Sequence, residues 1–321
     1  MQLVTYAEAE GNWRAGVLSG SAIVDIEAAA RDGGLDKDTV AGAWASAKGV
    51  VGHPAATLRS VAQSASERAA RGDSFPVEDA RLGPPVPDPE KIICVGVNYA
   101  AHSAEFQAPV PRTPILFPKF ATSLIGPGEA ICLPSVSRQI DWEGELAVVI
   151  GRSYKSVPVA SAMEVVAGRM PFNDVSARDL QMETSQRMAG KALDTFAPCG
   201  PSLVSVDEVG DVQDLELCTR VNGEVVQRAS TREMIFSAAE IISFVTELMT
   251  LNPGDIIATG TPEGVGFRRT PPRFLVAGDV VEVEVEGLGS LTNPVAGDRA
   301  DWTAEPGPDI GARYGAVSGR A

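Results

Sequence analysis

Histidine and cysteine are scarce in this sequence. His53 and His102 are the only histidines among 321 residues, so a zinc site of three histidines and the HExxH motif of metalloproteases are both excluded. No C-x-x-C pair occurs, which excludes a zinc ribbon and predicts reduced thiols that fill the core. The four cysteines are Cys94, Cys132, Cys199 and Cys218. A bound metal ion would therefore have to take most of its ligands from carboxylates.

Long apolar runs and an excess of basic residues are also missing. No apolar stretch reaches the ~18 residues of a transmembrane helix, and the N-terminal segment MQLVTYAEAEGNW lacks the basic patch and apolar core of a signal peptide. Asp and Glu outnumber Lys and Arg by 42 to 27, and the net charge of −15 argues against nucleic acid or an anionic membrane as a partner. We expect a cytoplasmic protein that binds neither.

The composition favours a β-rich α+β fold with few long helices. Hydrophobic residues at 44% and charged residues at 21% are ordinary for a globular protein. The 32 glycines and 23 prolines are numerous, and they favour short elements joined by turns. At ~150 residues per domain, the length fits about two domains.

Patterns along the chain predict four parts. Short strands followed by a helix over 55–72 predict a small α+β domain over 1–81. Four prolines within 82–90 forbid regular structure and predict a linker. We expect a larger domain over 91–297, and a polar tail rich in glycine and alanine over 298–321.

Three local signals predict elements inside the larger domain. The Ala/Met-rich segment 161–170 predicts a helix. Asn222-Gly223 is a hairpin turn signal. The spacing of apolar residues over 237–251 predicts a second helix, which the Asn-Pro-Gly at 252–254 ends.

The segment 140–150, IDWEGELAVVI, carries two acidic residues that matter chemically. In a strand the period of two places Glu143 and Glu145 on one face, which continues into apolar residues. Two neighbouring carboxylates that enter a core cost several kcal/mol per ion unless a cation compensates, and Mg²⁺ or Mn²⁺ would do so through oxygen ligands. The alternative is that the strand begins at an exposed edge and both glutamates are hydrated.

A third acidic residue and a histidine extend this pattern. Asp174 lies at a strand-to-helix transition, where it or Ser176 could instead cap the helix. With the two glutamates it would complete a three-carboxylate site. His102 and Glu105 are three residues apart on a predicted helical turn, so Glu105 could orient the ring as a general base, unless the two form an ordinary surface pair. His53 has no nearby acid, and we assign it no role.

Seven motifs in order resemble the fumarylacetoacetate hydrolase family over residues 91–296. They are GVNYAAHSAE, ILFPKFATSLIGP, DWEGELAVVIG, FNDVSARDLQ, GKALDTFAPCGP, DIIATGTPEGVG and GDVVEVEVEGLGSLTNPV. The resemblance implies mixed β-sheets rolled into a barrel-like sandwich and a homodimer. The N-terminal segment resembles the small, variable domain of longer members. This resemblance favours the metal-site and general-base interpretations over their alternatives.

The resemblance also assigns roles to single residues. It implies Mg²⁺ or Mn²⁺ held by Glu143, Glu145 and Asp174. His102 and Glu105 are similar to a catalytic dyad on a segment that acts as a lid in relatives. Further implied residues are Lys191, which faces the substrate as a catalytic residue, Thr261, which lines the pocket for the substrate carboxylate, and Gln181 and Lys119, which lie at motif positions near the active site.

Three features depart from the family pattern or extend it. Ala192 and Leu193 replace a Ser-Phe pair that frequently follows the lysine in the family. Gly144 stands where the family commonly has a small residue that is larger than glycine. These departures leave the metal ligands intact but affect the shape of the substrate pocket. The basic stretch 267–273 is either a solvated loop or a rim that attracts a dianionic substrate.

The resulting functional hypothesis is metal-dependent hydrolysis of a C–C bond in an acylpyruvate, a 2,4-dioxo acid. The metal would chelate the carboxylate and the 2-oxo oxygen, His102 would activate water, and Lys191 would stabilise the oxyanion. The same site could decarboxylate oxaloacetate or a related oxo-diacid, or isomerise or hydrate such an acid. A more distant alternative is a metal-binding protein without catalysis.

Overall fold

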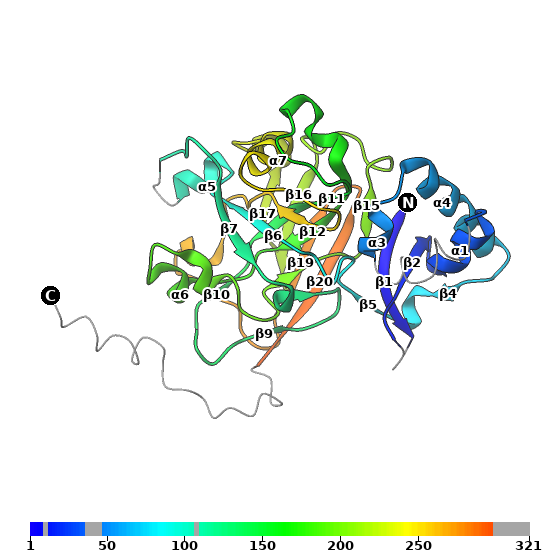
Figure 1. Cartoon of the computed structure of the whole chain (residues 1–321). Coiled ribbons are helices and arrows are strands. Elements are labelled where there is room, and N and C mark those ends of the chain that lie inside the picture. Colours follow the sequence, from blue (N-terminus) through cyan, green and yellow to red (C-terminus); the bar gives the residue numbers. More distant parts are fainter. Residues whose placement is uncertain (9–11, 36–46, 106–108, 298–321) are drawn as a thin grey trace.

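The computed structural model describes residues 1–8, 12–35, 47–105 and 109–297. The predicted C-terminal tail over 298–321 lies outside these ranges. In the described part, strands outnumber helices and belong to two larger sheets and two small pairs (Figure 1). The predicted β-rich α+β fold class is therefore confirmed.

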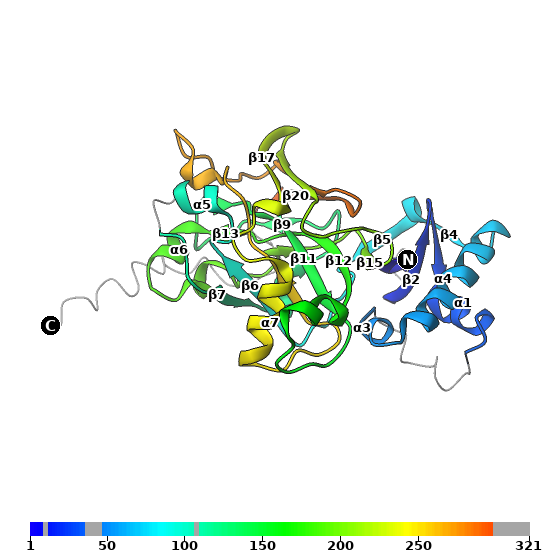
Figure 2. The same ribbon diagram turned by 90° about the horizontal axis from the view of Figure 1, so that it is seen from above.

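The N-terminal unit forms one end of a larger sheet, with helices packed on it (Figures 1 and 2). Asp25 ends β3 and its side chain accepts a hydrogen bond from the Ala28 N–H at 3.0 Å, which caps α1. Helices α1 and α4 contact each other and the strands β2 and β3. The elements are β1 (Gln2–Glu8), β2 (Arg14–Ser19), β3 (Ala22–Asp25), α1 (Ile26–Asp32), α3 (Ala47–Val51), α4 (Ala55–Ala70), β4 (Phe75–Pro76), the 3₁₀ helix η1 (Val77–Asp79) and β5 (Ala80–Gly83).

The largest sheet is shared by the N-terminal unit and the rest of the chain. Its order is β4-β3-β2-β1-β15-β12-β11-β18-β6-β7, with β5 paired to β1, and its pairs are antiparallel except for β18 and β6. Its other strands are β6 (Ile92–Gly96), β7 (Ile115–Lys119), β11 (Gly144–Ile150), β12 (Val166–Asn173), β15 (Leu203–Ser205) and β18 (Ile256–Ala258). All seven residues of the central strand β11 are buried, which explains its nearly continuous apolar sequence.

A second sheet packs against the central strands of the first. Its order is β17-β16-β19-β20-β9, and β16, β19 and β20 contact β11 or β12. Two small pairs, β10 with β13 and β14 with β8, complete the strands. The bounds are β8 (Leu124–Ile125), β9 (Ile131–Cys132), β10 (Ile140–Asp141), β13 (Ser176–Ala177), β14 (Ala197–Pro198), β16 (Glu216–Val221), β17 (Glu224–Ser230), β19 (Val280–Val285) and β20 (Gly289–Ala296). The predicted sandwich of mixed sheets is present.

Short helices fill the connections of the larger part. They are α5 (Ala100–Glu105), α6 (Arg178–Met182) and α7 (Ala238–Leu248), with the 3₁₀ helices η2 (Ala121–Ser123), η3 (Val159–Val165), η4 (Arg187–Gly190), η5 (Thr231–Glu233) and η6 (Gly266–Arg268). The predicted helices over 55–72 and 237–251 correspond to α4 and α7, and the Asn222-Gly223 turn joins β16 to β17 with positive φ at both residues.

The predicted helix over 161–170 is wrong. This segment forms the end of η3 and the first half of β12. Val165 and Val166 are buried, and β12 pairs with both β11 and β15. Pairing on both sides in the centre of a sheet outweighs the helical propensity of alanine and methionine.

The junction between the N-terminal unit and the larger part is continuous. In the sheet, Leu3 of β1 pairs with Leu203 of β15. Strand β5 begins in the predicted N-terminal domain and ends in the predicted linker, so the structure marks no break at 81; the division into domains stays a prediction. None of the helices in the described ranges has the length and apolarity that a membrane crossing requires.

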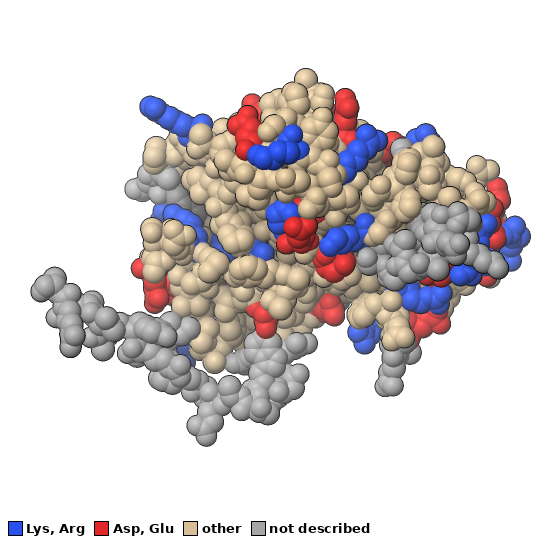
Figure 3. Space-filling view, in the orientation of Figure 1, with Lys and Arg blue, Asp and Glu red and all other residues tan. Residues whose placement is uncertain are grey.

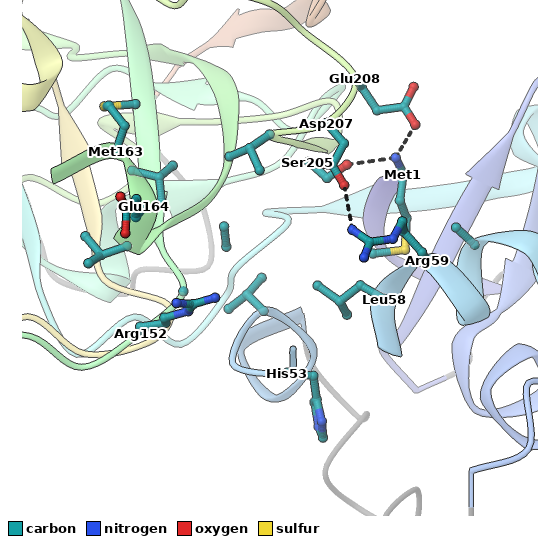
Figure 4. A pocket seen from close by; sticks show the side chains of 17 residues that line it. Met1, His53, Leu58, Arg59, Arg152, Met163, Glu164, Ser205, Asp207 and Glu208 are labelled. Atoms are coloured by element: carbon teal, nitrogen blue, oxygen red, sulfur yellow. Dashed lines mark hydrogen bonds and ion pairs between the residues drawn. The ribbon is translucent and has the colours of Figure 1, made fainter. Parts of the chain in front are cut away.

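A cavity of about 360 Å³ lies at this junction (Figure 4). Arg59 of α4 pairs with Asp207 at 3.7 Å across it, and the Met1 ammonium donates to the Ser205 hydroxyl at 2.8 Å. His53 lines this cavity, far along the chain from the predicted acidic cluster. These contacts link the two parts of the chain by side chains as well as by the sheet.

Candidate metal and catalytic centre

The three predicted metal ligands meet where β11 begins and β12 ends. These strands are antiparallel, with Gly144 opposite Asn173, so Glu143 and Asp174 are neighbours just outside the ladder. The Asp174 N–H donates to the Glu143 carbonyl at 2.8 Å. One carboxylate oxygen from each of Glu143, Glu145 and Asp174 lies within 4.8 Å of the others. The strand pairing therefore assembles the cluster.

Burial decides between the alternatives left open by the sequence. Glu143, Glu145 and Asp174 are only 5%, 1% and 0% exposed, so the glutamates are not hydrated at a sheet edge. Asp174 does not cap α6 either, because Ala177 is the N-cap and no side chain caps it. Ser176 donates its hydroxyl to the Asp174 carbonyl instead. The cluster is a buried set of carboxylates, as the metal-site hypothesis requires.

Basic side chains surround part of this cluster. The Lys191 ammonium lies 2.8 Å from Glu143 Oε2 and 2.7 Å from Asp174 Oδ2. The Arg178 guanidinium contacts Glu143 Oε1 at 2.5 Å and Asp141 Oδ2 at 2.8 Å. Asp141 also accepts hydrogen bonds from the backbone N–H groups of residues 142, 266 and 267. Each charge in this network is held by several partners.

The two glutamates differ in their protonation energetics. Burial opposes ionisation of Glu143, but the positive charges of Lys191 and Arg178 outweigh it and hold the pKa of this carboxyl well below its usual range. At Glu145, burial and then the negative charges of Asp174 and Glu143 raise the pKa well above its usual range. Glu145 is therefore the carboxylate whose charge this arrangement of side chains leaves least compensated.

The donor set fits a hard divalent cation. No ion pair reaches Glu145 within the described residues, and its Oε2 accepts the Gly260 N–H at 2.8 Å. The buried cations Lys119, Lys191 and Arg178 pair with Asp174, Glu143 and Asp141, which leaves Glu145 without a compensating cation among the described residues. Clustered carboxylate oxygens are the ligands that Mg²⁺ and Mn²⁺ take. The predicted three-carboxylate group able to hold such an ion is confirmed.

Lys119 lies behind the carboxylates. Its ammonium is 2.8 Å from Asp174 Oδ1 and donates to three backbone carbonyls, those of Val175, Lys191 and Phe196, at 3.0, 2.6 and 2.7 Å. The side chain is fully buried and does not line the cavity described below. Lys119 thus holds Asp174 and the Lys191 backbone in position, and contact with a substrate remains a prediction.

The predicted dyad is present on α5. His102 Nδ1 lies 3.2 Å from Glu105 Oε2, and Glu105 Oε1 accepts the Gly264 N–H at 3.1 Å. His102 is 5% exposed, so the pair is not an ordinary surface pair. Its imidazole also faces the carboxylate cluster closely enough to lower the pKa of Glu143, after the larger effects of burial, Lys191 and Arg178.

Asn98 fixes the start of the dyad segment and was not predicted. Its amide donates to the carbonyls of Phe236 and Thr259 at 3.0 and 2.7 Å, and its Oδ1 accepts the Phe236 N–H at 2.8 Å. Val97, just before it, has a φ of 57°, which a β-branched residue rarely adopts. These hydrogen bonds hold the strained turn that directs α5 toward the carboxylates.

A cavity of about 90 Å³ joins the dyad to the metal cluster. Of the predicted residues, His102, Glu143, Gln181, Lys191 and Thr261 line it. Thr261 donates its hydroxyl to the Gly144 carbonyl at 2.9 Å and accepts from Gln227 at 2.8 Å, which fixes the loop beside the glutamates. Catalytic and substrate-binding candidates from four distant motifs thus share one cavity.

Two arginines line the same cavity and were missed by the sequence analysis. Arg178 lies in the motif FNDVSARDLQ, where an arginine after a strand looks like a solvent-exposed helix residue. Arg187 lies in η4, outside every quoted motif, and its side chain is exposed. The signal that could have revealed Arg178 is the excess of carboxylates, because buried acids require buried cations.

The departures from the family pattern have structural explanations in part. A Cβ atom at Gly144 would lie 2.0 Å from Thr219 Oγ1, so this position has no room for a side chain. In the basic stretch 267–273, Arg269 and Arg273 both pair with Glu224, at 3.1 and 2.8 Å, and lie over the ring of Trp142. These arginines brace a loop and do not line the cavity. Leu193 packs against a buried apolar cluster that includes Leu180 and Phe196, whereas nothing in the structure explains Ala192.

Comparison with known proteins agrees with this geometry. Residues 91–296 match the family model of the fumarylacetoacetate hydrolase C-terminal domain. The chain belongs to the fumarylacetoacetate hydrolase family. The predicted family and fold are therefore confirmed.

Three relatives within the fumarylacetoacetate hydrolase family illustrate its range. The mitochondrial oxaloacetate tautomerase FAHD2A of Bos taurus is 51% identical over 213 residues, 66% of this chain and 68% of that protein. The structure of 5-carboxymethyl-2-hydroxymuconate delta-isomerase from Mycobacterium smegmatis is 35% identical, with a TM-score of 0.70, and covers 93% of this chain and 100% of its own. Maleylpyruvate hydrolase from Sphingobium sp. SYK-6, in complex with manganese(II) and pyruvate, is 31% identical, with a TM-score of 0.74 and the same coverage.

These relatives are enzymes of three reaction types, so enzyme function is supported and hydrolysis is not singled out. They also correct one expectation. The predicted cytoplasmic location is wrong by this comparison, because the tautomerase at 51% identity is a mitochondrial protein. An acidic composition does not distinguish the cytoplasm from other aqueous compartments.

Proposed function

We propose that this protein is a divalent-metal-dependent tautomerase of oxaloacetate, which interconverts its keto and enol forms. The observation that supports it is one small cavity that joins a buried three-carboxylate cluster, a histidine held by a carboxylate, and cationic side chains. The 51% identity to an oxaloacetate tautomerase supports the same choice.

The tautomerisation moves one proton from C3 of oxaloacetate to the C2 oxygen, and the residues present can divide this task. Mg²⁺ or Mn²⁺ held by Glu143, Glu145 and Asp174 would supply Lewis-acid polarisation of the 2-oxo acid. His102 would take the proton from C3 and, as the imidazolium, return it to the C2 oxygen, while Glu105 fixes the orientation of its ring.

The charge that develops on the substrate oxygen also needs stabilisation. Lys191 and Arg178 line the cavity and carry positive charge, because the neighbouring carboxylates raise the pKa of both groups despite burial. Cations fixed in a site of low polarity stabilise developing negative charge strongly. Gln181, also on the cavity wall, has amide N–H donors that would hold the substrate carboxylate, whereas the Thr261 hydroxyl already donates to the Gly144 carbonyl and contact of Thr261 with the carboxylate stays a prediction.

Hydrolysis of an acylpyruvate is the second candidate. The structural likeness to a maleylpyruvate hydrolase, and a dyad that could activate water, favour it. At 31% identity this support is weaker than that for the tautomerase. Decarboxylation of oxaloacetate needs the same cavity and is measured by the same experiment.

The test is to add Mg²⁺ or Mn²⁺ to the purified protein and to follow the enol absorbance of oxaloacetate, release of CO₂, and pyruvate formation from a panel of acylpyruvates. Acceleration of the enol–keto exchange without pyruvate formation supports the tautomerase. Pyruvate from an acylpyruvate supports the hydrolase instead, and no turnover on any substrate would leave a metal-binding protein.

Two variants test the division of roles. His102→Ala should keep metal binding and lower kcat by ~10²-fold or more, whereas Glu143→Ala should lose the metal in a calorimetric titration. Glu164→Gln, an exposed carboxylate outside the cavity, is the matched control and should change neither quantity. Full activity in His102→Ala would contradict the assigned base.

We also propose that the protein is a homodimer. Apart from a second copy of the chain, we propose that it binds only a small oxo-acid, and neither nucleic acid nor a membrane. The family resemblance supports the dimer. Light scattering after size-exclusion chromatography measures the mass directly against the 33.6 kDa of one chain. A mass near that of one chain would contradict the proposal.

A further inference from the structure

Arg187 differs from the other cations of the cavity. Lys191 and Arg178 are buried and hold carboxylates at 2.5–2.8 Å. Arg187 also lines the cavity, but its side chain is exposed and the structure gives it one hydrogen bond, to Met182 Sδ at 3.6 Å. Within the described residues no carboxylate pairs with it, and a thioether is a weak acceptor. Its guanidinium is therefore available to an anion that enters the cavity.

The segment that carries Arg187 is held firmly against the site. Arg187 begins η4, which packs on α6 and ends at Gly190, directly before Lys191. A Cβ at Gly190 would lie 2.4 Å from the Ala177 carbonyl oxygen, so only glycine permits this approach. The Lys191 N–H then bonds the Met188 carbonyl at 3.0 Å. The fold thus places one cation at the exposed end of the cavity and another at its buried end.

Apolar side chains also line this small cavity. Val95, Val97, Ile115 and Phe117 line the cavity, whose volume is about 90 Å³. The buried end offers the carboxylate cluster, Lys191 and Arg178, which suit the 2-oxo acid part of a substrate. The exposed end offers the planar donors of Arg187, which match a carboxylate in a two-point hydrogen bond.

We infer that Arg187 is a specificity-determining residue, which binds the distal carboxylate of a short oxo-diacid and so selects dianionic substrates over acids with an uncharged tail. This inference rests on the proposed function, because it names the substrate class for the same cavity. A different part of the site then holds each end of the substrate. The carboxylate cluster orients the reacting 2-oxo acid, and Arg187 binds the distal carboxylate.

The experiment compares two ligands that differ by one group. Pyruvate is oxaloacetate without its distal carboxylate, so calorimetric titration of both into the Mg²⁺-loaded protein isolates the contribution of that group. The wild-type protein should bind oxaloacetate more tightly than pyruvate. Arg187→Gln should weaken the affinity for oxaloacetate by about 10-fold or more, which is the usual scale for a lost charged hydrogen bond. The same variant should change the affinity for pyruvate by no more than about twofold. Arg187→Lys should recover part of the loss.

Arg152→Gln is the matched control, because Arg152 is exposed and lines only the junction cavity. It should change the affinity for neither ligand. Equal affinity of the wild type for both ligands, or equal weakening of both in Arg187→Gln, overturns the inference. Binding does not require turnover: selective weakening of oxaloacetate in a protein that catalyses no enol–keto exchange would uphold the role of Arg187 and reject the proposed function.

Discussion

At the scale of single residues, the charged groups of the site differ in their ion-pair partners. Motifs identified the three acids, the dyad and Lys191, because each stands in a recognisable sequence context. They could not show that Lys191 pairs with two of the acids, or that Arg178 and Asp141 form a buried pair, since these contacts join residues 17 to 48 positions apart. Sequence patterns identify chemical groups, whereas the partners of a buried charge depend on strand register.

A substitution of Lys119 tests whether this residue stabilises the fold or contacts the substrate. Replacing it as Lys119→Met removes the ammonium from Asp174 and leaves three carbonyls without a donor. We expect a loss of about 3–5 kcal/mol in the free energy of unfolding, typical of breaking a buried ion pair. Urea denaturation measures it.

Lys155→Met is the control for this change. Lys155 also donates to two carbonyls, but it is exposed, so the cost should stay below about 1.5 kcal/mol. If Lys119→Met instead keeps its stability and only raises KM, Lys119 contacts substrate as the family resemblance implies.

Gly144 lies between the two glutamates and should be coupled to Thr219. A Cβ at Gly144 would overlap Thr219 Oγ1, and that hydroxyl has no hydrogen-bond partner among the described residues. Gly144→Ala alone should cost about 1–3 kcal/mol or more of unfolding free energy through overpacking.

Thr219→Ala alone should be nearly neutral, and the double variant should recover at least half of the loss. A double-mutant cycle by denaturant unfolding measures this coupling. Additive effects would show that the clash is relieved by movement of the backbone instead.

At the scale of elements, local signals succeeded where they had no competitor. The Asn-Gly turn and the apolar spacing over 237–251, which predicted α7, are local in sequence and in structure. Segment 161–170 failed because its conformation is set by strands β11 and β15, which lie elsewhere in the chain.

The capping box of α7 should make stability depend on pH. Hydrogen bonds from the Ser237 hydroxyl and then its backbone N–H lower the pKa of Glu240 below its usual 4.5. A lowered pKa in the folded state means that Glu240 stabilises the protein above pH 4.5, and that this contribution disappears as the pH falls through the lowered value.

Glu240→Ala should therefore cost about 0.5–1 kcal/mol at pH 7, and the difference from wild type should shrink below pH 4.5. Thermal unfolding across this pH range measures it. Glu247→Ala, near the other end of α7, should show no such convergence. If the stability difference between wild type and Glu240→Ala stayed constant down to the lowest pH measured, the lost stability would not come from the charge of the carboxylate.

At the scale of the whole molecule, the acidic excess of the composition divides between the surface and the interior. On the face drawn in Figure 3, acidic and basic side chains are interspersed among other residues. Two of the three predicted metal ligands, Glu145 and Asp174, are at most 1% exposed, so a part of the acidic excess is not on the surface at all. Net charge alone could not have located that part.

The N-terminal unit is predicted to fold only with the rest of the chain. Residues of both parts form one hydrophobic core, in which Val24, Ile26 and Val61 belong to the same cluster as Ile92 and Phe172. The sheet crosses the junction as well, through the pairing of β1 with β15. Because one core serves both parts, the full chain should unfold in a single cooperative transition.

Deleting residues 1–81 would expose the edge of β15 and the apolar side chains of that shared core. An unpaired strand edge beside exposed apolar surface favours aggregation, so the truncated chain should be insoluble or should unfold at a markedly lower temperature. Soluble yield and thermal unfolding by circular dichroism, compared with the full chain, measure this. A soluble truncated chain with an unchanged melting temperature would show instead that residue 81 marks a true domain boundary, as the sequence pattern predicted.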